Sequence, residues 1–246
     1  MIFEDILTVF WRDWRVLKRR LGKFILSRMV APMLYLVAFG WGLGRSIETA
    51  GGSYLNFIVP GILALNSMNI SFGSIMPLHA ERVYHKSLDE YILAPVSPSA
   101  FIVGKILSAV LRGLISSAII MALAFLFGAN ISIGLPLILI LALNCVIFAQ
   151  IGFFAAMKIN TYEEMAQVNT YVLLPMSFLC GTFFLTATLP AGARFIIDLL
   201  PLTHTSSLLR SLCSGGEIAP LSLAVLLFYA ALGFWLDKRA FAAMDA

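Results

Sequence analysis

Six long apolar stretches, separated by short polar connectors, constrain this chain more than any other feature of its sequence. An α-helix needs about 20 apolar residues, rising about 1.5 Å each, to cross the hydrocarbon core of a bilayer. Each stretch is near or above that length, and the fifth is the shortest. The stretches cover residues 24–43, 54–78, 101–127, 135–157, 168–185 and 218–236.

The composition argues against a water-soluble globule. Hydrophobic residues make up 60% of the chain and charged residues only 12%, whereas soluble domains contain roughly 45–50% and about 25%. Because part of a soluble protein's side chains must face water, a globule of this size could not bury so much apolar surface. The sequence therefore predicts a single all-α membrane domain over residues 1–246, with six transmembrane helices.

Lysine and arginine fall mainly on one side of the predicted spans. With the N-terminus inside, thirteen of the 17 lie on the inner side, three on the outer side, and one, Arg112, within a span. The side rich in Lys and Arg is normally cytoplasmic. We therefore expect both termini in the cytoplasm, which requires an even number of spans.

The first 22 residues have the pattern of an amphipathic helix. Apolar residues recur every three or four positions and form one stripe, and Arg12, Arg15 and Arg19 lie off it. A helix with an apolar face and a basic face lies in the membrane interface, where anionic lipids attract it. Residues 1–22 are thus predicted to be an interfacial helix; the alternative is a positively charged anchor for the first span. The stripe consists of Phe3, Ile6, Leu7, Phe10, Trp14, Leu17 and Leu21.

No pattern in the sequence indicates a catalytic site. Gly104-Lys105 is followed by Ile106 and lacks the upstream glycine of a phosphate loop, and the motifs HExxH, CxxC and GxSxG are absent. His79 and His85 flank Glu81, which is a weak metal signal. We therefore expect no catalytic residue, no metal and no cofactor in this chain.

Residues 80–95 form a connector of mixed charge between the second and third spans. Apolar residues alternate with its charges, and Pro95 and Pro98 end any helix before the next span. A short charged helix on the inner membrane surface suits docking to a soluble partner, whereas the plain alternative is an ordinary solvated loop. The candidate docking residues are Glu81, Arg82, Lys86, Asp89, Glu90 and Tyr91.

The outer segment 186–216 is too apolar for a loop in water and too interrupted to span. Pro190 and Pro201 break it, and Gly215-Gly216 end it. Since irregular backbone at membrane depth must be buried in protein, we expect a pair of short helices re-entering the outer leaflet; a hairpin lying on the surface is the alternative. Its charged and titratable residues, placed near an exit, are Arg194, Asp198, His204 and Arg210.

Arg112 is the basic residue deepest inside a predicted span. At the bilayer centre an arginine would be costly and therefore functional. One or two turns from the interface, its side chain would snorkel to the headgroups. We favour snorkelling and leave the functional alternative open.

Two segments resemble a known family. The stretch ERVYHKSLDEYILAPVSPSAFIVGKIL (81–107) is similar to the "E-R … L … L … A-P … GK" stretch of permeases of the ABC-2 family. The segment LPAGARFIIDLLPLTHTSSLLR (189–210) is similar to that family's outer element before the last span. Span order and length also agree, and residues 201–204 resemble the branch that exports lipooligosaccharides and nodulation factors.

The resemblance implies the transmembrane subunit of an ABC exporter. Two copies would form the pathway, and two separate ATPase subunits would bind ATP and Mg²⁺ at the inner face of a bacterial inner membrane. Residues 80–95 would be the coupling helix that docks on the ATPase. The substrate would be a glycan, a lipid-linked saccharide or an amphipathic molecule. The main alternative is a secondary transporter or channel driven by an ion gradient, which usually has ionisable residues or broken helices at mid-membrane.

Overall fold

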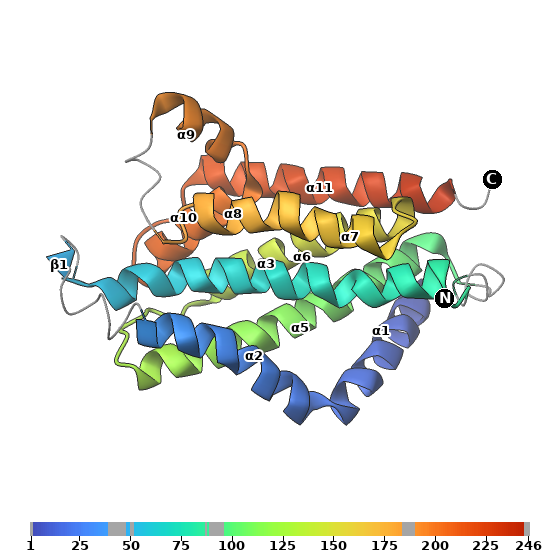
Figure 1. The fold of residues 1–246 in the computed structure, drawn as a ribbon, viewed down its shortest axis with the longest axis horizontal. Coiled ribbons are helices and arrows are strands. Elements are labelled where there is room, and N and C mark those ends of the chain that lie inside the picture. The colour runs from blue at the N-terminus through green and yellow to red at the C-terminus, as the bar shows by residue number, and fades with distance from the viewer. Residues whose placement is uncertain are drawn as a thin grey trace.

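The computed structural model is a bundle of long helices with one short β-hairpin (Figure 1). It describes residues 2–38, 48–49, 52–86, 88, 96–183 and 190–243. In chain order the elements are α1 (Ile2–Arg19), α2 (Leu21–Tyr35), β1 (Glu48–Thr49), β2 (Gly52–Ser53), α3 (Tyr54–Val83), α5 (Pro98–Leu126), α6 (Leu135–Lys158), α7 (Tyr162–Val168), η2 (Asn169–Leu173), α8 (Leu174–Leu179), α9 (Ala191–Asp198), α10 (Pro201–Cys213) and α11 (Pro220–Ala242).

Helices α3, α5 and α6 form the centre of the bundle and pack against one another. Helix α1 lies across α5, α11 lies along α6, and α10 packs on α3, α6 and α11. The hairpin pairs Glu48 with Ser53 and Thr49 with Gly52, at the opposite end of α3 from α1 (Figure 1). We call the end where α1 lies, and where α3, α6 and α11 finish, the basic end.

Five described helices are long and apolar enough to cross a membrane: the helix beginning at Leu21, α3, α5, α6 and α11. The predicted all-helical membrane class is thereby confirmed, and the number of six remains a prediction. The predicted span 168–185 falls on three consecutive helical segments, α7, η2 and α8.

The polar connector between the fourth and fifth apolar stretches is helical from Tyr162 onward, where α7 begins. The Thr161 side chain accepts a hydrogen bond from the Glu164 amide at 3.2 Å, capping α7, and two glutamates occupy its first turn. Threonine followed three residues later by glutamate is a helix-start signal, and acids suit the positive end of the helix dipole. The π-helical η2 immediately precedes Pro175 in α8. A proline removes a helical N–H and clashes with the preceding turn, which explains the wider coil there.

Polar side chains inside the bundle join helices to one another. The Asn144 amide donates to the Ser67 hydroxyl at 2.8 Å, and the Thr205 hydroxyl donates to the Asn144 side-chain oxygen at 2.9 Å. All three residues are buried, so this contact ties α10 to α3 and α6. Gln150 likewise donates to the Ala230 carbonyl at 3.0 Å and ties α6 to α11. These polar residues form hydrogen bonds between helices, as is common in membrane bundles.

Candidate functional site

Helix α1 approaches α5 closely at Gly104. A Cβ built at this glycine would lie 2.8 Å from the Val9 Cβ and 3.2 Å from the Ile6 carbonyl oxygen. Contacts this short require the absence of a side chain, so the two backbones come together at this point. Because Asp13 lies one turn beyond Val9 and Lys105 directly follows Gly104, the crossing brings their side chains together.

The face that α1 buries differs from the predicted stripe. Leu17 of the stripe is buried together with Val9, which lies outside it, whereas Phe3 and Leu7 of the stripe are exposed. Asp13 lies on the buried face between Val9 and Leu17, at four-residue spacing. Helix α1 therefore presents one seam to α5 and leaves Phe3 and Leu7 of its apolar stripe uncovered. The stripe's position in a membrane interface stays a prediction.

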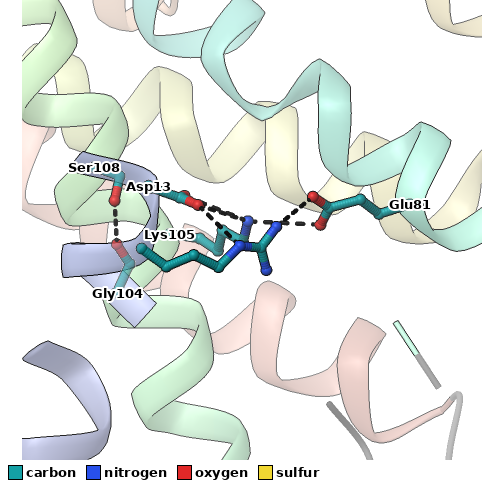
Figure 2. Close-up of polar contacts among 6 residues, drawn as sticks. Asp13, Glu81, Gly104, Lys105 and Ser108 are labelled. Atoms are coloured by element: carbon teal, nitrogen blue, oxygen red, sulfur yellow. Dashed lines mark hydrogen bonds and ion pairs between the residues drawn. The ribbon is translucent and has the colours of Figure 1, made fainter. Parts of the chain in front are cut away.

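Four charged side chains meet at the basic end and form what we call the charge cluster: Arg12, Asp13, Glu81 and Lys105. The Lys105 Nζ lies 3.3 Å from an Asp13 carboxylate oxygen and 3.6 Å from a Glu81 oxygen. Figure 2 shows Lys105 between the two acids. Arg12 donates to the other Glu81 oxygen at 2.7 Å and lies 3.9 Å from Asp13. The cluster joins α1, α3 and α5.

The balance of charge explains how a lysine can lie inside the bundle. The Lys105 side chain is 7% exposed, and those of Asp13 and Glu81 are 14% and 19% exposed. A buried ammonium costs several kcal/mol, roughly, unless opposite charges surround it. Two cations and two carboxylates share the cluster, so each buried charge has a partner of opposite sign.

Arg82, the next residue after Glu81, points to a different helix. Its guanidinium donates to the main-chain carbonyls of Met157 and Ile159, and to the Asn160 side-chain oxygen at 2.9 Å. The last carbonyls of a helix lack intrahelical partners and carry partial negative charge. Arg82 thus satisfies the end of α6 and ties it to the end of α3.

The structure divides the predicted docking residues into three groups. Glu81 and Arg82 bind other helices of the same chain through the contacts above. Lys86 is exposed beyond the end of α3, with a positive φ of 50°. Asp89, Glu90 and Tyr91 lie outside the described residues. A docking role for any of them stays a prediction.

The predicted outer segment contains two short helices, α9 and α10. The His204 ring bridges the Asp198 carbonyl, at 2.8 Å, and the Ser222 hydroxyl, at 3.2 Å. It thereby connects the end of α9 to the start of α11. On the exposed side of α9, Arg194 lies 3.5 Å from the Asp198 carboxylate. Re-entry of this segment into a membrane stays a prediction.

Arg210 of α10 contacts α3 and the turn that follows α8. It donates to the Gly181 carbonyl at 2.7 Å and lies 4.1 Å from the centre of the Phe57 ring. Gly181 has a φ of 76° just after α8, the conformation that suits a glycine at a helix end. Burial lowers the pKa of Arg210 to about 10, so it is still charged at neutral pH and holds α8 against α3.

Arg112 lies on α5, two turns beyond Lys105, and is half-buried. Its charged neighbours include Asp13 of α1 and Arg28 of α2. It therefore lies close to the level of α1 along the bundle. This placement fits a side chain that reaches toward the basic end, and its role stays a prediction.

Sequence reasoning missed the charge cluster as a unit. Lys105 and Arg12 counted only toward the excess of positive charge, and Asp13 was not singled out. One local signal was present: Asp13 is an acid within a strongly basic segment. An acid at such a position is expected to have a specific basic partner.

Comparison with known proteins agrees with this architecture. Residues 4–213 match the ABC-2 type transporter family. The chain is 26% identical to nodulation protein J of Bradyrhizobium diazoefficiens, over 95% of this chain and 92% of that protein. It is 25% identical to nodulation protein J of Rhizobium meliloti, over 94% and 90% respectively. It is also 25% identical to the inner membrane transport permease YadH of Escherichia coli K12, over 73% and 71%. The match over most of its length shows that this chain belongs to the ABC-2 family of membrane permeases.

Proposed function

We propose that this chain is the transmembrane subunit of an ATP-driven exporter. The family match over residues 4–213 carries the proposal, since it covers the helices of the bundle up to the end of α10. In this proposal two copies of the chain form the pathway. Separate ATPase subunits, two in number, bind ATP and Mg²⁺ and supply the energy.

The charge cluster and Arg82 support a specific route for coupling. The end of α3, up to Val83, forms the first part of residues 80–95, the proposed docking segment. Glu81 fastens that end of α3 to α1 and α5, and Arg82 fastens it to α6. A movement of the docking segment would therefore pull four helices together instead of bending a free loop. Rigid transmission of this kind is what a domain-scale rearrangement requires.

The proposed setting is the inner membrane of a bacterium, with both termini in the cytoplasm. One relative is named an inner membrane transport permease, and the lysines and arginines concentrate at one end of the bundle. The proposed substrate is a glycan, a lipid-linked saccharide or another amphipathic molecule. The matches to nodulation protein J support the branch that residues 201–204 resemble.

Affinity purification in mild detergent from the native host tests the proposal. We expect an equimolar soluble ATPase to co-purify, with a total mass that fits two copies of each chain. A homo-oligomer without ATPase, reproducible across detergents, would contradict the proposal and favour a secondary transporter or channel.

The coupling route has its own test in the reconstituted complex. Reversing both charges in the variant Glu81→Arg/Arg82→Glu should lower the amount of substrate moved per ATP hydrolysed. The matched control is Lys158→Glu, at an exposed lysine where α6 ends. Unchanged transport per ATP in the double variant, with the complex intact, would reject this route.

A further inference from the structure

Helix α11 packs along α6 and also contacts α10 and α5. Few of its side chains are fully buried: Leu226, Asp237, Ala240 and Phe241. Three of these four lie in the last two turns, at the basic end. The attachment of this end of α11 therefore depends on a short segment that contains a carboxylate.

Asp237 is fully buried there without a polar partner. Its residue is 0% exposed, and neither carboxylate oxygen accepts a hydrogen bond within the described part of the chain. One turn further, the Phe241 ring lies 5.6 Å from the Phe101 ring of α5 and 6.5 Å from the Phe153 ring of α6. The carboxyl group thus lies beside an aromatic cluster.

The charges on neighbouring elements are directed elsewhere. On α11 itself, Lys238 lies over the Phe234 ring at 5.7 Å and Arg239 over the Trp235 ring at 3.9 Å. On α5, Lys105 is held by the charge cluster. On α6, Lys158 is exposed at the helix end. Among the described residues, no cation lies within 4 Å of Asp237.

An ionised carboxylate without a partner is strongly disfavoured in such surroundings. Moving one out of water costs several kcal/mol, roughly, even after the protein relaxes, and binding a proton removes most of that cost. A protonated carboxyl can also donate a hydrogen bond to a main-chain carbonyl. The packed form of α11 is therefore compatible with a neutral Asp237 and not with a charged one.

We propose that Asp237 is a proton-binding site that controls the attachment of α11 to α5 and α6. With the proton bound, the last two turns of α11 pack as described. When these turns separate from the bundle, the carboxyl group meets water and releases its proton to it. The attached form binds the proton more tightly than the separated form, so low pH favours attachment and rising pH favours separation. The inference does not depend on an ATPase partner or on the substrate.

The first experiment is infrared spectroscopy of the full-length permease in lipid nanodiscs. We expect a C=O stretch of a protonated carboxyl group near neutral pH that disappears in the variant Asp237→Asn. Asparagine has nearly the shape of a neutral aspartic acid and preserves the packing. A spectrum in which the wild type and Asp237→Asn show the same protonated-carboxyl band would overturn the proposal.

Amide hydrogen exchange of residues 234–242 tests whether the proton on Asp237 controls the attachment of α11. The wild-type protein alone can give the decisive result. The measured exchange rates are first corrected for the intrinsic effect of pH on exchange. The equilibrium constant for separation of these turns from the bundle should then rise up to tenfold per pH unit, as release of one proton requires. In Asp237→Asn it should be independent of pH. A pH-independent opening equilibrium in the wild type would overturn the proposal, even if the variant fails to fold.

Discussion

Replacing Lys105 by methionine should destabilise the permease strongly. Methionine preserves the length and apolar stem of the side chain, so the variant removes the charge and little packing. Lys105 stands between Asp13 and Glu81 at 3.3 and 3.6 Å. Without it, two nearly buried carboxylates share only Arg12, whose side chain is 40% exposed.

The distances in the charge cluster give the size of this loss in the free energy of unfolding. At the effective dielectric constant of about 20 that suits such sites, each pair contributes roughly 5 kcal/mol of gross attraction. Desolvation of the ammonium offsets much of this, since burying a charge costs several kcal/mol, roughly. Removal of one member of a buried ion pair typically costs about 3–5 kcal/mol. Because Asp13 and Glu81 keep some contact with water, we expect about 2–4 kcal/mol for Lys105→Met.

Reversible unfolding of the purified permease in mixed micelles measures this change. The matched control is Lys158→Met, at an exposed lysine of the same bundle end, which should lie within about 0.5 kcal/mol of the wild type. Adding Glu81→Gln to Lys105→Met should recover part of the loss, because it removes one of the two carboxylates that Arg12 alone would have to neutralise. Equal stability of Lys105→Met and Lys158→Met would refute the argument that the cluster holds the helices together.

Three further predictions concern the contacts between helices. Gly104→Leu should separate α1 from α5, because even a Cβ there would collide with Val9. Proteolysis within α1 should become faster in this variant and stay unchanged in the control variant Gly22→Leu. Asn144→Ala should cost about 1–3 kcal/mol by removing the buried hydrogen bonds through which α6 joins Ser67 of α3 and Thr205 of α10, and an unchanged unfolding midpoint would contradict it. Arg210→Met should lower thermal stability by about 1–2 kcal/mol through loss of its hydrogen bond and its contact with the Phe57 ring, and Arg210→Lys should recover only part of this.

The local properties of the sequence predicted the elements well. Hydropathy and length located α3, α5, α6 and α11, since a long apolar segment in a membrane protein has few structures other than a helix. Prolines and glycines predicted that 186–216 would contain short helices, and the structure has α9 and α10 there. The start of α7 was missed although its cap, Thr161 followed by Glu164, was visible in the sequence.

Side-chain roles were harder to predict where they depend on partners distant in the chain. Glu81 and Arg82 were assigned to docking because they lie in the charged connector 80–95, and that role stays a prediction. Their side chains bind Lys105 on α5 and the end of α6, partners that no periodicity reveals. For Asn144 and Gln150, only the packing of the helices places the side-chain amides in hydrogen bonds between helices.

By itself the sequence determined the membrane class, the positions of the long helices and the concentration of positive charge at one end. These follow from hydropathy, helix length and charge, which are sums over neighbouring residues. Only the tertiary structure decided that Asp13, Glu81 and Lys105 form one cluster, because Gly104 lets α1 approach α5 at one point. It also decided that Asp237 lies buried without a partner while Lys238 and Arg239 lie over aromatic rings. Whether a charge is paired, buried or solvated depends on which helices meet, and the order of residues along the chain does not specify that directly.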